Sequence, residues 1–311
     1  MRQPPGKPTL PILSELPPGY FVEEAPGGVL ALSIDYAQQL HGLGFGPEED
    51  GQLKVSDLHG RKPLYEYDLG DERLVVRRYS HGGLLRWLTG KRFLDPERPF
   101  RELILGDALR RSHIATPRVV AARARPAFGG GWYLDLMTRR IEDSLDFGAV
   151  IESVRRGELP DSVRARAISA LGDLLRKLHS FGLLHADLQP RNLMLSKADL
   201  VEPDPGEEPE PIKIWVIDLD QSAFVETLSK SERRRNLRRL FRAIDRRDKT
   251  GGRFLRSGDY ARFFRAYDPD RTHWKEDWRR ISTEHSRRGA FHWLGQVFER
   301  IFSDSTKRKG I

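Results

Sequence analysis

One short polar segment carries acid, amide and imidazole side chains at a spacing suited to phosphoryl transfer. It reads His185-Ala-Asp187-Leu-Gln-Pro-Arg-Asn192, and Ile-Asp218 follows further along the chain. Phosphoryl transfer needs a carboxylate that accepts the proton of the attacking hydroxyl, together with oxygen ligands for a divalent cation. We therefore predict that Asp187 is the base and that Asn192 and Asp218 hold Mg²⁺. His185 is expected to hold the backbone of the loop.

The neighbouring segments would position these side chains. Leucines and isoleucine at helical spacing after Pro160 predict a long helix that ends at Gly182. Short apolar runs at 193–195 and 212–217 predict two strands of a hairpin, with Asn192 and Asp218 beside its ends. In the structural alternative, Asp187 and Asn192 would only brace a turn.

The remaining patterns indicate an α+β protein with a small β-rich lobe and a larger, mainly helical lobe. We interpret residues 1–50 as a loosely structured extension, 51–140 as the first lobe and 141–311 as the second. Within the first lobe we predict a β-hairpin at 62–79, a helix at 99–111, and strands at 119–122 and 132–137. An acidic, proline-rich insert at 198–211 is expected to be an exposed loop.

Composition excludes several classes of protein. The chain has 311 residues, 38% of them hydrophobic and 32% charged, which suits one large domain or two lobes. It contains no cysteine, so disulfides and thiol chemistry are excluded, and a reducing cytosol fits. No run of apolar residues is long enough to span a membrane, and the proline-broken first twenty residues do not resemble a secretion signal.

Positive charge is concentrated in one stretch. The whole chain carries +8, and residues 230–247 contain nine basic and two acidic residues. Apolar residues at Leu237, Leu240, Phe241 and Ile244 predict an amphipathic helix. Its basic face is either a solvated surface or a dock for phosphates, and the candidate docking residues are Arg234, Arg235, Arg238 and Arg239.

The segments around Asp187 and Asp218 resemble a known protein family. HADLQPRNLML (185–195) and WVIDLDQSAF (215–224) are similar to the eukaryotic-like kinase fold, and within it to the bacterial lipopolysaccharide core kinases, with 3-deoxy-D-manno-octulosonic acid (Kdo) kinase the nearest. Three further segments, 60–69, 74–94 and 98–142, and the basic NLRRLFR (236–242) also resemble it. The resemblance covers about residues 58–245.

The resemblance implies a protein-kinase-like fold that binds ATP and Mg²⁺. Asp187 matches the catalytic base, and Asn192 and Asp218 match the metal ligands. Glu102 matches the helix glutamate that orients a strand cation, here Arg77 where most kinases have lysine. Gly60 would lie in the phosphate-covering loop, and Leu136, Met137, Thr138 and Arg139 would form the hinge that contacts adenine.

The resemblance also implies the acceptor and the location of the enzyme. The expected reaction is ATP-dependent phosphorylation of a Kdo or core heptose hydroxyl on the lipid A precursor. The enzyme would act as a peripheral protein on the cytoplasmic face of the inner membrane, in contact with its anionic surface. Asp220 replaces the glycine of the usual Asp-Phe-Gly, which argues against the switching seen in protein kinases. No Ala-Pro-Glu segment is present to build a platform for a peptide substrate, which argues against a protein kinase. Gln189-Pro190 differs from the asparagine-containing loop expected in Kdo kinases.

Other hypotheses stay open from the sequence. The acceptor could be a small molecule, as in aminoglycoside phosphotransferases, or a protein, as in RIO-like kinases. A pseudokinase scaffold would bind nucleotide without turnover, although Asp187, Asn192 and Asp218 are all present. A nucleic-acid partner ranks last because no recognised binding module is present, and no obligate protein partner is inferred.

Overall fold

The computed structural model describes residues 10–58, 63–80, 92–202, 206, 210–251 and 255–270. The chain divides into two compact units. The first unit comprises Met1–Ile141 with Leu219–Gln221, and the second comprises Glu142–Asp218 with Ser222–Ile311. The predicted boundary between residues 140 and 141 lies one residue away from this division.

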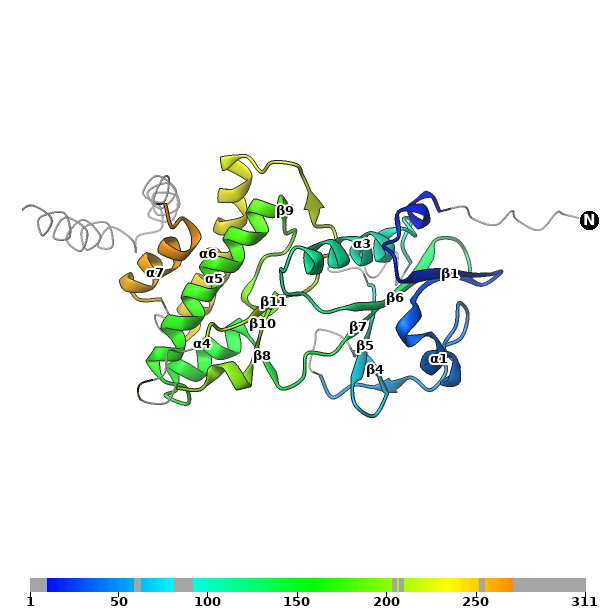
Figure 1. Ribbon diagram of the computed structural model, residues 1–311, viewed down its shortest axis with the longest axis horizontal. Coiled ribbons are helices and arrows are strands. Elements are labelled where there is room, and N and C mark those ends of the chain that lie inside the picture. Colours follow the sequence, from blue (N-terminus) through cyan, green and yellow to red (C-terminus); the bar gives the residue numbers. More distant parts are fainter. Residues whose placement is uncertain are drawn as a thin grey trace, which may run out of the picture. The chain divides into compact units, whose positions relative to one another are not determined.

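A seven-stranded antiparallel sheet forms the centre of the first unit (Figure 1). Its strand order is β1-β2-β6-β7-β5-β4-β3. The predicted hairpin at 62–79 is confirmed as β4 and β5, and the two predicted strands are confirmed as the longer β6 and β7. The strands are β1 (Tyr20–Ala25), β2 (Gly28–Ser33), β3 (Lys54–Val55), β4 (Tyr65–Asp68), β5 (Arg73–Arg78), β6 (Val119–Pro126) and β7 (Trp132–Arg139).

The N-terminal segment is part of this sheet. Residues 11–42 form η1 (Pro11–Glu15), the hairpin β1–β2 and α1 (Ile34–Gly42). Every residue of β2 is buried, and the strand pairs with β6 from Val29↔Ala124 to Leu32↔Ala121. The prediction of a loosely structured extension is therefore wrong for these residues. The Pro and Gly residues that suggested it make the turns between short elements.

Among the described residues, an α-helix packs on each face of the sheet. The predicted helix at 99–111 is confirmed as α3 (Arg98–Arg111), whose Phe100 and Leu103 pack in one core cluster with Leu136 of β7. On the opposite face, Leu40 of α1 packs in a second cluster with Met137. Leu136 and Met137 point to opposite faces because side chains alternate along a strand.

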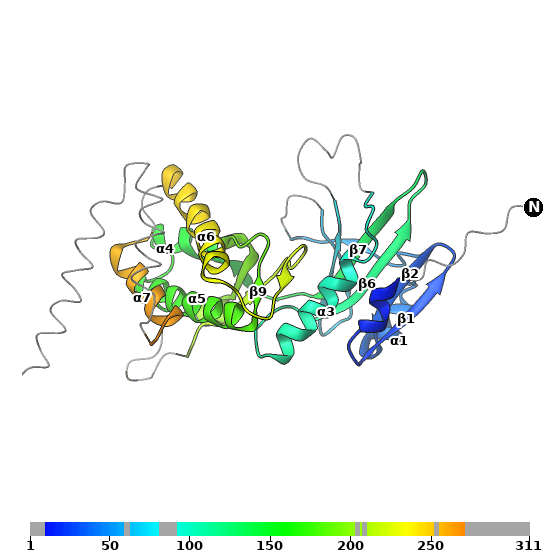
Figure 2. The same ribbon diagram turned by 90° about the horizontal axis from the view of Figure 1, so that it is seen from above.

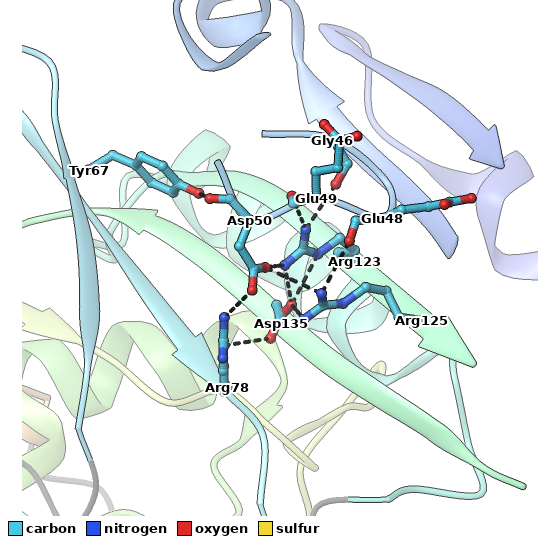
Figure 3. A network of polar contacts seen from close by, with 9 residues as sticks. All are labelled: Gly46, Glu48, Glu49, Asp50, Tyr67, Arg78, Arg123, Arg125 and Asp135. Atoms are coloured by element: carbon cyan, nitrogen blue, oxygen red, sulfur yellow. Dashed lines mark hydrogen bonds and ion pairs between the residues drawn. The ribbon is translucent and has the colours of Figure 1, made fainter. Parts of the chain in front are cut away.

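A buried arginine ties the loop before β3 to the sheet (Figure 3). Arg123 is 1% exposed, and its guanidinium donates to Asp135, to the carbonyls of Gly46 and Glu49, and to the carboxylate of Asp50. These bonds use all five guanidinium N–H groups. They offset the cost of removing the charge of Arg123 from water. Arg78 and Arg125 extend the network around the same two carboxylates.

The second unit consists of helices with two small sheets, β11-β10-β8 and β12-β9. The predicted long helix is confirmed as α5, the predicted hairpin as β10 and β11, and the predicted basic helix as α6. The elements are β8 (Ser144–Asp146), α4 (Phe147–Arg155), α5 (Asp161–Phe181), β9 (Leu183–Leu184), η2 (Pro190–Asn192), β10 (Leu193–Ser196), η3 (Lys197–Leu200), β11 (Ile214–Val216), β12 (Ala223–Phe224), α6 (Lys230–Gly251) and α7 (Ser257–Tyr267).

Helices α5 and α7 pack closely (Figure 2). A Cβ atom on Gly172 would lie 2.4 Å from the carbonyl oxygen of Phe263, so this contact requires glycine. Arg164 of α5 and Asp259 of α7 form an ion pair between side chains that are 6% and 0% exposed. Gly182 ends α5 with φ of 92°, as its position after the last apolar residue predicts.

Part of the acidic insert and the last part of the chain lie outside the described residues. At the start of the insert, η3 interrupts the predicted loop. Within the described ranges, no helix is both long enough and apolar enough to cross a membrane.

Candidate functional site

The loop that carries Asp187 lies between β9 and β10 of the second unit. Leu188 is fully buried and anchors the loop in the core, while Pro190 begins the single turn η2 that ends at Asn192. The loop therefore holds its polar side chains next to the start of β10, the central strand of the sheet β11-β10-β8.

Asp187 is held by neighbouring cations and an amide. Arg191 Nη2 donates to its Oδ2 at 2.7 Å, and Gln189 Nε2 donates to its Oδ1. Arg239 of α6 places Nη1 3.9 Å from Oδ1. Partial burial raises the pKa of Asp187, but these hydrogen bonds and the charges of Arg191 and Arg239 together lower the pKa below its ordinary 3.8. The carboxylate is thus ionised at neutral pH, as a general base must be.

The structure brings Asn192 to Asp187. Asn192 Nδ2 donates to the Asp187 carbonyl at 2.7 Å, and the Asn192 carbonyl accepts from the Ile217 amide at 3.0 Å. β10 and β11 pair with Leu193 opposite Val216, so Asp218 follows directly from the strand beside Asn192. Asp218 has φ of 60°, the left-handed region that a non-glycine residue seldom adopts, and such strain is typical of functional positions.

The donor set suits Mg²⁺ in its chemistry. The Asn192 amide nitrogen donates to Asp187, while its amide oxygen has no hydrogen bond among the described residues, and Asp218 supplies a carboxylate. Within the described part of the chain, no three His, Cys, Asp or Glu side chains gather as a metal cluster. A cation here would take two protein ligands and complete its shell with phosphate and water oxygens, as Mg²⁺ commonly does.

His185 holds the backbone, as predicted. Its Nε2 lies 3.2 Å from the Ile217 carbonyl, which can only accept, so Nε2 carries the proton. Nδ1 then accepts from the Asp187 amide at 3.1 Å. Burial lowers the pKa of His185, so the ring stays neutral and links the loop to β11.

Sequence reasoning missed Asn236. On α6, its Nδ2 donates to the His185 carbonyl at 2.8 Å, and its Oδ1 accepts from the His185 amide at 3.2 Å. Behind it, His179 of α5 lies between Asn236 and Tyr267 of α7, at 3.4 and 2.7 Å. The sequence did contain a signal for this role. Asn236 precedes Leu237 and Leu240 within the apolar stripe of α6, where a buried asparagine needs hydrogen-bond partners.

In the first unit, the structure pairs Arg77 with Glu102. Arg77 Nη2 donates to Glu102 Oε2, and Glu102 is 5% exposed. The Tyr79 hydroxyl donates to the same oxygen, and the Leu219 amide donates to Glu102 Oε1 at 3.1 Å. Burial and the Glu102 charge raise the pKa of Tyr79 far above its usual value. The role of the pair in nucleotide binding stays a prediction.

Asp220 has a partner in the same unit. Arg98, the first residue of α3, donates Nε to Asp220 Oδ1 at 3.1 Å and Nη2 to Oδ2. Glu102 and Arg98 therefore attach the segment Leu219–Gln221 to α3 at two points. Asp220 stands where the kinase motif Asp-Phe-Gly has glycine. Its carboxylate therefore makes a bidentate contact with Arg98 that glycine could not make.

The predicted hinge is placed wrongly. Residues 136–139 form the end of β7, where Met137 pairs with Val76 on one side and Ala121 on the other. Backbone groups that are paired on both sides cannot bind adenine, and the chain passes between units after Ile141. Gly60 lies outside the described residues.

The four candidate docking arginines separate into two pairs. Arg235 and Arg239 are exposed, whereas Arg234 and Arg238 are half-buried and engaged in other interactions. Arg242 and Arg246 are also exposed, so the exposed positions follow i, i+4, i+7 and i+11 along α6. We call Arg235, Arg239, Arg242 and Arg246 the arginine row.

Comparison with known proteins identifies the family to which this chain belongs. A model described as "Lipopolysaccharide kinase (Kdo/WaaP) family" matches residues 50–267. The chain is similar to the 3-deoxy-D-manno-octulosonic acid kinase of Actinobacillus succinogenes, with 24% identity over 208 residues that cover 66% of this chain and 79% of that protein. It is also similar to the Haemophilus influenzae protein of the same name, with 28% identity over 152 residues that cover 47% of this chain and 56% of that protein.

A solved structure of "WaaP in complex with acyl carrier protein" shares the fold. The TM-score is 0.55 with 17% sequence identity, over 88% of this chain and 99% of the other. This likeness confirms the predicted protein-kinase-like α+β fold.

Proposed function

Because the chain belongs to the lipopolysaccharide kinase (Kdo/WaaP) family, we propose that it transfers the γ-phosphoryl group of ATP to a Kdo hydroxyl on the lipid A precursor. The protein is a kinase of lipopolysaccharide synthesis. Both relatives are named as kinases of 3-deoxy-D-manno-octulosonic acid, which supports Kdo over a core heptose as the acceptor.

Asp187 carries the chemistry in this proposal. Its carboxylate accepts the proton of the sugar hydroxyl while the hydroxyl oxygen forms a bond to the γ-phosphorus of ATP. The bond from that phosphorus to the bridging oxygen breaks, and ADP leaves with the electron pair. The products are the phosphorylated sugar, ADP and a protonated Asp187, which returns its proton to water.

Asn192 and Asp218 would hold Mg²⁺. The cation supplies charge neutralisation on the phosphate oxygens. Arg77, oriented by Glu102, is the proposed cation for the other phosphates, and its planar fork suits a phosphate oxygen pair.

One observation carries the proposal. An ionised Asp187 with an acceptor position left on Oδ1 directly contacts Asn192, and the Asn192 carbonyl accepts a hydrogen bond from Ile217, the residue between β11 and Asp218. Two arginines beside Asp187 and the left-handed Asp218 favour this function over a loop that only braces a turn.

We also propose a location. A lipid A precursor lies in a membrane, so the enzyme would work as a peripheral protein on the cytoplasmic face of the inner membrane. Arg235, Arg242 and Arg246 of the arginine row would contact the anionic lipid surface there, since each arginine near such a surface contributes about 1 kcal/mol.

Acceptor competition tests the function. The full chain is incubated with γ-labelled ATP and, in turn, Kdo-lipid A, a Kdo-free heptose acceptor, an aminoglycoside and a generic protein. We expect label on Kdo-lipid A. Label on another acceptor would identify that acceptor instead, and ATP binding without transfer to any of them would indicate a pseudokinase.

A further inference from the structure

The two carboxylate oxygens of Asp187 differ in the number of hydrogen bonds that they accept. Oδ2 accepts hydrogen bonds from Arg191 at 2.7 Å and Asn192 at 3.5 Å. Oδ1 accepts one, from Gln189, among the described residues. Since each oxygen of an ionised carboxylate can accept about two hydrogen bonds, the remaining position for a sugar hydroxyl lies on Oδ1.

Arg239 approaches that same oxygen. Its Nη1 lies 3.9 Å from Oδ1, which is an ion pair but too long for a hydrogen bond. The side chain is 45% exposed, and no hydrogen bond joins its guanidinium to another residue in the described part of the chain. Arg239 therefore presents unused donors beside the position where the reacting hydroxyl would bind.

We propose that Arg239 binds the carboxylate of Kdo and thereby selects an acidic sugar over a neutral one. This inference rests on the proposed function and names the group that recognises the acceptor. In a sugar acid, the carboxylate and the hydroxyls belong to one small molecule, so a hydroxyl on Oδ1 brings the carboxylate within reach of Arg239. A guanidinium fork matches a carboxylate in two parallel hydrogen bonds, whereas a neutral heptose offers no such partner.

The terminal phosphate of ATP is the competing partner for Arg239. The two cases differ in which substrate loses affinity when the arginine is removed. Arg235 provides a matched control, because it is exposed on the same face of α6 one turn earlier and has the same charge.

The experiment measures kcat/KM for two acceptors, Kdo-lipid A and its carboxyl amide, which is close to the free acid in size and carries no charge there. We expect the wild-type chain to prefer the free acid by about ten- to a hundred-fold, the range typical of a charged hydrogen-bonded pair. Arg239→Ala should reduce that preference to less than about three-fold while the KM for ATP changes less than about two-fold. Arg239→Lys should retain part of it, and Arg235→Ala should lower both rates by one common factor.

Each outcome decides the question. Equal wild-type rates on the acid and the amide overturn the inference and leave the kinase function in place. A preserved preference in Arg239→Ala, or a large rise in its KM for ATP, also overturns it. If the wild-type chain phosphorylates neither acceptor, the proposed function fails and this inference fails with it.

Discussion

Asn236 hydrogen-bonds both backbone groups of His185, so that one side chain of α6 fixes the start of the loop that carries Asp187. The His185 carbonyl accepts from Asn236 Nδ2 at 2.8 Å, and the His185 amide donates to Oδ1 at 3.2 Å. His185 in turn accepts from the Asp187 amide. The position of Asp187, the proposed base, therefore depends on a buried residue of α6.

Replacing Asn236 should weaken both stability and turnover. Asn236→Ala leaves a buried N–H and a buried carbonyl unpaired, which costs about 2–4 kcal/mol of unfolding free energy. Because the loop loses its anchor, we expect kcat to fall about ten-fold or more while the KM for ATP changes little. Urea unfolding and steady-state kinetics measure the two effects. Asn236→Asp, which keeps the acceptor, should be intermediate, and an Asn236→Ala enzyme with wild-type kcat would refute the positioning role.

His179 should make stability depend on pH. Its ring lies buried between Asn236 and Tyr267. Burial disfavours the charged ring and lowers its pKa from 6.5 to about 4, although the hydrogen bond with Asn236 opposes the shift. Between pH 6.5 and 4 the unfolded chain binds the additional proton, so stability is full above about pH 6.5 and falls as the pH is lowered toward 4. The loss over this window is about 3 kcal/mol.

Urea unfolding at a series of pH values checks this window. His179→Gln should flatten the slope. The remaining slope should come from His185, whose pKa burial also lowers, and toward pH 4 from carboxylates with a lowered pKa such as Asp187. A His179→Gln variant with an unchanged slope would contradict the assignment.

The ion pair between Arg77 and Glu102 should affect ATP more than the acceptor. Glu102→Gln removes the charge that orients Arg77 and keeps the size of the side chain. We expect the KM for ATP to rise about ten-fold and that for the acceptor to change less than two-fold. Arg77→Lys should retain more activity than Arg77→Ala. Equal effects on both substrates would show that the pair only supports the fold.

The arginine row should bind anionic vesicles. Neutralising Arg242 and Arg246 together with glutamine should weaken binding to vesicles containing anionic lipid by roughly thirty-fold, at about 1 kcal/mol per charge. The effect should disappear at high salt. The control replaces Lys177 of α5 and Arg265 of α7, which are also exposed. An equal loss in the control would show a general charge effect and no docking surface.

Local patterns in the sequence were sufficient for several elements. The apolar period and Gly182 predicted α5, and the spacing of Asp187 and Asn192 predicted that one polar loop between a long helix and a short strand carries both residues. These features depend on neighbours within a few residues, where periodicity and capping act directly.

Elements stabilised by distant partners could not be predicted in this way. β1 and β2 owe their stability to pairing with β6, and Arg123 is buried because the loop at 46–50 satisfies its donors. In the sequence, Arg123 lies between alanines like an exposed strand residue. Asn236 and the true end of β7 were missed for the same reason, since their partners lie far away along the chain.

Asp187→Asn tests the central claim most directly. The substitution keeps the size of the side chain but removes the proton acceptor, so the fold and the affinity for ATP should persist. Phosphate transfer from labelled ATP to Kdo-lipid A should fall by about a hundred-fold or more. Transfer at the wild-type rate by a folded, ATP-binding Asp187→Asn protein would contradict the account.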